Sequence, residues 1–315
     1  MNKGVGQVTK FFFILGRENQ MVEWKTAEKA RKLKEHLNRD GKLTLRVCAY
    51  DALSARLIQL SGFEVVGTTG YGISASLIGQ PDIGLVGYAE MLERVRTIVN
   101  ATDLPVDADI DTGYGNALNV YWTVKNFAKI GVAGVRLEDQ IWPKRCGHME
   151  GKSIVSSEEM VSKIRAAVDA RNEENPGLVI GARTDARSIA GFEEVLRRAK
   201  AYADAGADYI YVEAPQSIEE VRTLVREVPK PISFNIIPGG KTPLFDFDEL
   251  VKVGVRYLSI PMVCLYPATK AMMEALKALK ERNFQEVVEL GVSWSEFNEI
   301  VGYSEWRTLE SKYSH

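Results

Sequence analysis

The sequence is short of cysteine and histidine, has no long apolar run and carries almost no net charge. Its 315 residues include three cysteines, which are far apart and form no CxxC pair. This spacing argues against a disulfide framework and a structural zinc site, and it favours a reducing compartment. The formal net charge of -2 gives no reason to expect nucleic acid or an anionic membrane as a partner.

One apolar stretch near the start, KFFFILG at residues 10–16, is a candidate targeting signal. Its core is too short for a signal sequence or a spanning helix, and no small-residue cleavage site follows it. We therefore expect a cytoplasmic protein with no membrane partner, in which residues 1–24 form an N-terminal extension.

From residue 44 onward, runs rich in Val and Ile alternate with amphipathic helical patterns. About eight strand-helix units can be distinguished, the number that closes a (β/α)8 TIM barrel. An open doubly wound sheet would need a glycine-rich turn after the first strand, and AYDALSA at residues 49–55 has none. We predict an α/β fold with a catalytic barrel over residues 25–285 and a C-terminal helical tail over residues 286–315.

Polar residues follow the predicted strands at their carboxyl ends, where barrel enzymes carry their chemistry. Asp109 and Asp111 are two positions apart and point to the same side, and Glu138 at the end of the next strand can join them. So many carboxylates in one barrel mouth would repel one another without a cation. All-oxygen ligation suits Mg²⁺ or Mn²⁺. The alternative is that each carboxylate caps a helix or pairs with a basic residue, which their clustering makes less favoured.

The segment IWPKRCGHMEGKS, residues 141–153, has neither strand nor helix periodicity and is predicted to be a loop. Cys146 lies in it among cationic residues that could stabilise a thiolate. By contrast, Cys48 and Cys264 lie in or just after apolar strands, so we expect both in the core.

The three histidines differ in their surroundings. His36 lies in the polar run KLKEHLNRD and His315 is terminal, so we expect both in solvent. His148 follows the loop cysteine by two positions and is a candidate donor to a substrate.

Several motifs occur together in one order, namely TTGYGISAS, GQPDIGL, DIDTGYGN, LEDQ with KRCGH, GARTDA and GGKTP. On these motifs the chain resembles the isocitrate lyase/phosphoenolpyruvate mutase superfamily over nearly all of the predicted barrel. The resemblance is strongest to the branch of small lyases that act on 2-methylisocitrate and 2,3-dimethylmalate. It implies a Mg²⁺-dependent carbon-carbon lyase and a homo-oligomer, usually a tetramer in which a C-terminal helix is exchanged between neighbouring barrels.

The resemblance also implies roles for particular residues. The implied metal site contains Asp82, Asp109, Asp111 and Glu138, partly through water. The implied substrate site contains Thr69, Gly70, Tyr71, Gly147, His148, Arg183 and Asn235, with Arg183 on a substrate carboxylate. Cys146 matches the catalytic acid of the lyases. The general base is left open between Tyr50 and Glu213.

The chemistry that the resemblance implies is retro-aldol cleavage of a 2-hydroxy dicarboxylic acid, which gives an α-keto acid such as pyruvate and a second carboxylic acid. Met149 and Pro238 replace polar residues common in methylisocitrate lyases, which favours a smaller and more apolar substrate. The alternatives are hydrolysis of oxaloacetate to oxalate and acetate, and phosphoenolpyruvate mutase or phosphonopyruvate chemistry on the same barrel. A catalytically silent binding module is disfavoured by the complete motifs.

Overall fold

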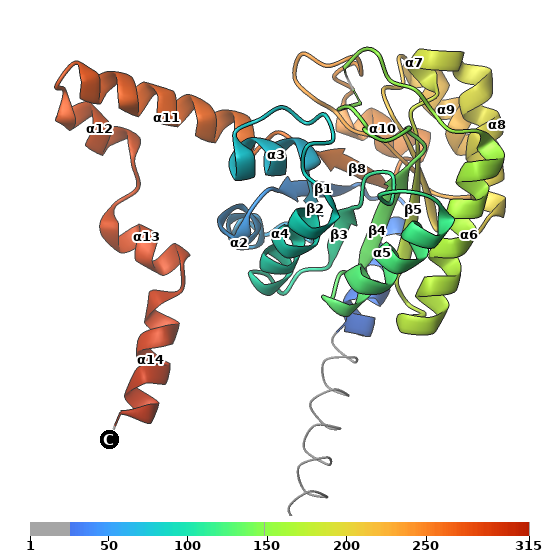
Figure 1. The fold of residues 1–315 in the computed structure, drawn as a ribbon. Helices are drawn as coiled ribbons and strands as arrows, with labels where there is room; N and C mark the ends of the chain where they lie inside the picture. The colour runs from blue at the N-terminus through green and yellow to red at the C-terminus, as the bar shows by residue number, and fades with distance from the viewer. Residues whose placement is uncertain (1–25, 148, 315) are drawn as a thin grey trace, which may run out of the picture.

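The computed structural model describes residues 26–147 and 149–314, so the predicted extension at residues 1–24, His148 and His315 lie outside the described residues. Eight parallel strands form one sheet in the order β7-β6-β5-β4-β3-β2-β1-β8 (Figure 1). They are β1 (Thr44–Ala49), β2 (Val65–Thr68), β3 (Val106–Asp109), β4 (Gly134–Glu138), β5 (Val179–Thr184), β6 (Tyr209–Val212), β7 (Ile232–Ser233) and β8 (Tyr257–Ile260). Beyond β7, Asn235 pairs with Ser259 and brings the two edges together. The predicted TIM barrel is confirmed.

Helices connect the strands on the outside of the barrel (Figure 1). They are α2 (Ala52–Leu60), α3 (Gly70–Ile78), α4 (Tyr88–Asn100), α5 (Ala117–Lys129), α6 (Ser157–Glu174), α7 (Arg187–Ala190), α8 (Phe192–Asp204), α9 (Ile218–Glu227) and α10 (Phe247–Val253). Gly254 ends α10 in the left-handed conformation at a φ of 100°, which a residue with a side chain rarely adopts. Local sequence and tertiary structure therefore agree on where this helix stops.

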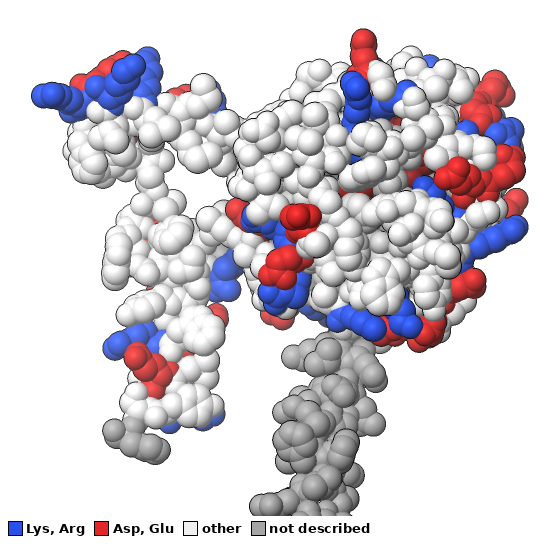
Figure 2. All heavy atoms as spheres, in the orientation of Figure 1, with Lys and Arg blue, Asp and Glu red and all other residues white. Residues whose placement is uncertain are grey.

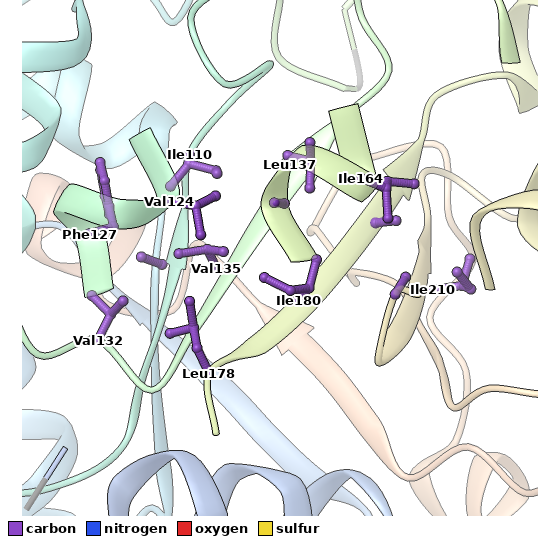
Figure 3. Close-up of a cluster of buried hydrophobic side chains, with 14 of the residues drawn as sticks. Ile110, Val124, Phe127, Val132, Val135, Leu137, Ile164, Leu178, Ile180 and Ile210 are labelled. Carbon is purple, nitrogen blue, oxygen red and sulfur yellow. The ribbon is translucent and has the colours of Figure 1, made fainter. Parts of the chain in front are cut away.

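The main apolar core lies between the strands and the surrounding helices (Figure 3). In β4, Val135 and Leu137 face this layer, where they are packed with Phe127 of α5 and Ile164 of α6. The alternating residues Arg136 and Glu138 point into the barrel instead, because successive side chains of a strand lie on opposite sides. Each fully buried large apolar side chain stabilises the folded protein by about 1.5–3 kcal/mol.

The lower half of the barrel interior is polar rather than apolar. Asp107 accepts from the Nε of Arg46 at 2.8 Å and from the hydroxyls of Tyr209 and Tyr257 at 2.8 and 3.0 Å. All four side chains are fully buried, so the charges must be paired to be tolerated there. This network forms the floor beneath the carboxyl ends of the strands.

A helix over residues 26–37 closes the amino-terminal end of the barrel, with Leu33 and Leu37 fully buried. His36 on the same helix is only 7% exposed, and its Nδ1 lies 3.5 Å from the Thr44 hydroxyl. The prediction that His36 is solvated was wrong, because this helix is covered by the barrel end. Cys48 is buried as predicted, whereas Cys264 is only half-buried at the edge of the core.

The presence of a C-terminal helical segment is confirmed, but it begins earlier than the predicted residue 286. It consists of α12 (Phe284–Leu290), α13 (Trp294–Ile300), α14 (Tyr303–Tyr313) and the preceding α11 (Leu265–Lys280), which was predicted to belong to the barrel. Helix α11 projects away from the barrel, and α12 to α14 continue as an arm beside it (Figure 1). The visible face of this arm is largely uncharged (Figure 2). Its exposed apolar residues include Met272, Met273, Leu276, Phe284, Trp294 and Trp306. Across residues 26–147 and 149–314, no helix has both the length and the apolar character needed to cross a membrane.

Candidate active site

A small cavity lies at the carboxyl ends of the strands. Its volume is about 40 Å³, which has room for a few waters but is far below the size of pockets that hold organic ligands. The predicted site residues that line it are Thr69, Gly70, Tyr71, Asp82, Asp109, Glu138, Cys146, Gly147, Arg183, Glu213 and Asn235. Residues distant in the sequence therefore meet in one place, and the covering loop residues 144–147 have to move before an organic ligand can enter.

Among the described residues, Tyr50 and Asp111 are predicted site residues that are not part of this cavity wall. Tyr50 packs against the cluster of Ile237 and Met262, and burial raises the pKa of its hydroxyl. Asp111 is buried just behind the wall and contacts Lys144, which does line the cavity. Tyr50 as general base thus stays a prediction, without support from its position.

The turn after β3 presents two carboxylates to the site. The Asp109 N–H donates to the Thr68 hydroxyl at 2.8 Å, and the Asp111 N–H donates to Asp109 Oδ1 at 3.1 Å. Asp111 has a φ of 49°, a backbone conformation that is rare outside glycine and recurs at functional sites. The turn therefore holds the two carboxylates next to each other at an energetic cost.

The two carboxyl groups differ in acidity because their neighbours differ. Burial acts to raise the pKa of Asp109, but Arg136, with its Nη2 at 2.8 Å from Oδ2, and the nearby Lys144 hold that pKa well below its usual range. Burial, together with the adjacent carboxylates of Asp109 and Asp82, raises the pKa of Asp111 to about 6, although Lys144 acts in the opposite direction. Asp109 is thus an anion throughout the neutral range, and Asp111 gains a proton as the pH falls below about 6.

Lys144 is the cation of this carboxylate cluster. Its Nζ lies 2.7 Å from Asp82 Oδ1 and 2.7 Å from Asp111 Oδ1, and its side chain is buried. A buried ammonium between two carboxylates relieves the repulsion that the sequence predicted. The loop thereby contributes a charge to the acidic end of the site.

The acidic residues fit a magnesium ion with few direct protein ligands. Within the two described ranges, no group of three or more His, Cys, Asp or Glu side chains is placed to hold an ion directly. Mg²⁺ commonly uses one or two carboxylates, with water and substrate oxygens as the other ligands. Glu138 Oε1 is buried and has no hydrogen-bond partner among the described residues, so it retains a lone pair for a bound water. The donor set therefore suits Mg²⁺, while the four-residue metal site stays a prediction.

Arg183 is the central cation on the opposite side of the cavity. Its guanidinium lies 3.3 Å from Glu138 Oε2, 2.7 Å from Asp185 Oδ2 and 3.2 Å from Glu213 Oε2. Asn235 Nδ2 lies 3.5 Å from the other oxygen of Glu213. A guanidinium held in one plane by several carboxylates is preorganised to bind a further carboxylate in the cavity.

The amino terminus of α3 forms a third wall. The Thr69 hydroxyl accepts from the Gly72 N–H at 3.3 Å, and Gly70 and Tyr71 line the cavity. A Cβ on Gly70 would lie 3.2 Å from the Nζ of Lys144, so a larger residue would crowd this wall. Helix amino termini favour anions, which agrees with the predicted role of these residues in binding one end of a substrate.

Cys146 reaches the cavity from the 141–153 loop, which has the irregular structure that was predicted. Its N–H donates to the Asp82 carbonyl at 3.1 Å, and its carbonyl accepts from the Met149 N–H at 2.8 Å. Gly147 lies directly against the Glu213 side chain in the cavity wall, because a Cβ on Gly147 would lie only 2.1 Å from Glu213 Oε1. The loop thus covers the cavity and places a thiol beside the residues predicted to bind substrate.

Comparison with known proteins agrees with this geometry. Residues 33–280 match the family model described as phosphoenolpyruvate phosphomutase. A 2,3-dimethylmalate lyase from Eubacterium barkeri is 45% identical over 286 residues, which cover 90% of this chain and 98% of that protein. The chain belongs to the phosphoenolpyruvate mutase/isocitrate lyase superfamily.

Other members of the superfamily are also similar to this chain. A 2-methylisocitrate lyase from Aeropyrum pernix is 36% identical over 84% of this chain and 85% of its own length. A solved oxaloacetate acetylhydrolase, in complex with the inhibitor 3,3-difluorooxalacetate, matches with a TM-score of 0.85 and 34% identity over 91% of this chain and 97% of that one. The resemblance inferred from the sequence motifs is confirmed.

Sequence reasoning assigned no supporting role in the site to three residues that the structure places there. Lys144 was considered only as a neighbour of the cysteine, although an excess of buried carboxylates implied a nearby cation. Arg136 holds Asp109, and its inward position follows from the alternation in β4. Asp185 holds Arg183 through two contacts, and its spacing of two residues on one strand end was a usable signal.

Proposed function

We propose that the protein is a Mg²⁺-dependent lyase that cleaves the C2–C3 bond of a 2-hydroxy dicarboxylic acid. The products are an α-keto acid such as pyruvate and a second carboxylic acid. The observation that carries the proposal is the placement of Cys146 over a cavity with Arg183 on one side and carboxylates on the other. The 45% identity to a 2,3-dimethylmalate lyase supports it.

The chain's own residues divide the work of this reaction. Arg183 and the amino terminus of α3 bind the two ends of the diacid. A base removes the proton of the 2-hydroxyl, and Glu213, which lines the cavity 3.2 Å from Arg183, is better placed for this than Tyr50. The electrons of the breaking bond pass to C3, which becomes the carbon of an enediolate. The Cys146 thiol then donates its proton to that carbon.

The carboxylate cluster would hold the metal. Asp109 and Asp111, with Asp82 and Glu138 partly through water, are the proposed ligands of Mg²⁺, and Mn²⁺ has suitable chemistry to replace it. A bound cation stabilises negative charge on oxygen as it develops. The residues of the chain orient the diacid and exclude water once the loop covers it.

The substrate that we favour carries alkyl substituents. Ile237, Pro261 and Met262 line one side of the cavity, and they offer apolar contact to a methyl group rather than a partner for a third carboxylate. Hydrolysis of oxaloacetate is the second candidate, because a solved oxaloacetate acetylhydrolase has such a similar fold. Phosphonate chemistry is the third, and the cysteine over the cavity argues against it because phosphoryl transfer creates no carbanion to protonate.

We further propose a cytoplasmic homotetramer in which the arm of α11 to α14 packs on a second copy. The support is the large apolar surface that the arm exposes, with Trp294 80% and Trp306 68% accessible. Light scattering at micromolar concentration should give four times the chain mass of 35.1 kDa. Deletion after residue 285 should lower the number of chains in the assembly, and a monomeric mass for the full chain would contradict the proposal.

The function is tested by incubating the purified protein and Mg²⁺ with 2,3-dimethylmalate, 2-methylisocitrate, oxaloacetate and phosphonopyruvate in separate reactions. Product identification by mass spectrometry should show pyruvate from a 2-hydroxy diacid, with the fastest turnover for 2,3-dimethylmalate. Oxalate and acetate as the main products from oxaloacetate would support the second candidate instead. Turnover of phosphonopyruvate alone would overturn the lyase proposal.

A further inference from the structure

Lys152 connects the cysteine loop to the strand end that carries the substrate-binding arginine. Its ammonium donates to the carbonyl of Gly147, the residue after the cysteine, and to Asp185 Oδ1 at 2.7 Å. The side chain of Lys152 is only 3% exposed. A buried ammonium is stable only when its N–H groups donate to acceptors of the protein. Both contacts are therefore needed to keep Lys152 buried in this position.

The acceptor Asp185 is held firmly from several directions. Arg183 donates to it through Nε at 2.7 Å and through Nη2 at 3.0 Å. The Asp185 N–H donates to Asp139 Oδ1 at 2.9 Å, and Asp139 in turn accepts from Arg198 and Tyr202 of α8. Asp185 is therefore held in a fixed position, and Lys152 links the loop to it.

The base of the loop is anchored independently of Lys152. The Ile141 N–H donates to the Ser153 carbonyl at 2.8 Å, and the Val155 N–H donates to the Asp139 carbonyl at 2.8 Å. Gly147 lies farther along the loop, against Glu213. The Cys146 N–H also donates to the Asp82 carbonyl, so loss of the contact from Lys152 should loosen the residues around the cysteine and leave the base in place.

We propose that Lys152 is a positioning residue that sets the distance between the proton donor Cys146 and the substrate-binding Arg183. The link runs from Arg183 through Asp185 and Lys152 to the Gly147 carbonyl. A charge-assisted hydrogen bond of this kind shifts a local equilibrium by roughly tenfold to a hundredfold. The inference about loop position stands on these contacts alone, and its effect on catalysis rests on the proposed lyase function.

Hydrogen exchange of the substrate-free protein tests the loop directly. In Lys152→Met, the amides of Cys146 and Met149 should exchange at least about tenfold faster than in the wild type, while those of Ile141 and Val155 should not change. Lys163→Met is the matched control, because this buried lysine contacts the Thr112 carbonyl and Glu159 and does not contact the loop. It should leave loop exchange unchanged.

Two further results keep the test decisive. Should Lys152→Met fail to fold, the double variant Lys152→Met with Asp185→Asn removes the buried carboxylate together with its partner and should show the same faster exchange. If the folded protein turns over a 2-hydroxy diacid, Lys152→Met should lower kcat by at least about tenfold and change KM less than threefold. Loop exchange within twofold of the wild type in a folded variant would overturn the inference, whatever the activity.

Discussion

The strand ends and the 141–153 loop supply the same cavity with groups held in very different ways. Asp109, Arg183 and Glu213 lie at or directly after the carboxyl ends of strands, are 8%, 7% and 1% exposed, and are fixed by neighbouring backbone and ion pairs. Cys146 is half-buried on a segment without regular structure and is held by a few polar contacts. In the proposed mechanism, the rigid scaffold binds the substrate, and the segment that has to move for substrate entry donates the proton.

Removal of the metal should have the largest effect, because it disables the rigid side of the site. EDTA should abolish turnover of the 2-hydroxy diacid, and added Mg²⁺ or Mn²⁺ should restore it, as followed by the release of pyruvate. Asp111→Ala should lower turnover by at least about 10²-fold. It should also lower the thermal stability, because it removes one carboxylate partner from the buried ammonium of Lys144. Full activity after exhaustive chelation would show that the carboxylate cluster serves a purely structural purpose.

Replacement of the loop thiol should have the next largest effect. Cys146→Ser should lower kcat by about 10²–10⁴-fold, the usual contribution of a positioned general acid, while KM changes little. Cys264→Ser is the control and should retain wild-type activity. A Cys146→Ser enzyme with the wild-type rate would remove the proton donor from the loop and restore the phosphonate alternative.

The rates at which the three cysteines are alkylated compare loop and core thiols in an experiment that needs no substrate turnover. Iodoacetamide should modify Cys146 first, because burial raises the pKa of Cys264 to about 11 and that of Cys48 above its usual range. Peptide mapping by mass spectrometry reports the rate at each site. Product with Mg²⁺ should slow the modification of Cys146, and equal rates at all three cysteines would contradict the difference between loop and core.

The smallest predicted effect is on the pH dependence of metal binding. Burial raises the pKa of Asp111 from 3.8 to about 6 in the metal-free protein, so below that pH the metal has to displace a proton. The apparent affinity for Mg²⁺, measured by calorimetry, should fall by up to about tenfold per pH unit below pH 6. In Asp111→Asn this fall should become shallower, while burial also raises the pKa of the proposed ligand Glu138, which keeps part of the dependence. A flat profile in the wild type would contradict the prediction.

The sequence was sufficient for the barrel, because its strands and helices follow local periodicity. Strand ends and the family resemblance together predicted most of the residues that line the cavity. Alternation in the strands predicts the inward position of Glu138, and the ends of strands predict Arg183 and Asn235. Periodicity carries no information on residues that meet through the loop. The place of Lys144 among the carboxylates therefore became visible only in the structure.

Two other predictions show that local sequence patterns do not report packing between distant parts of the chain. His36 lies in a polar stretch of sequence but is covered by the end of the barrel. Tyr50 follows a strand as predicted, but its side chain packs beside Ile237 and Met262 outside the cavity wall. In both cases contacts distant in the sequence determined the exposure and direction of the side chain.

The most direct test of a carbon-carbon lyase that protonates an enediolate carbon is cleavage of 2,3-dimethylmalate in D₂O with Mg²⁺, followed by NMR of the products. Breaking the C2–C3 bond yields pyruvate and propionate, and the thiol of Cys146 will have exchanged its proton for deuterium. We predict equal amounts of the two products, with one deuterium at C2 of propionate. Propionate without deuterium, or no formation of pyruvate from any 2-hydroxy diacid tested, would contradict the proposed reaction.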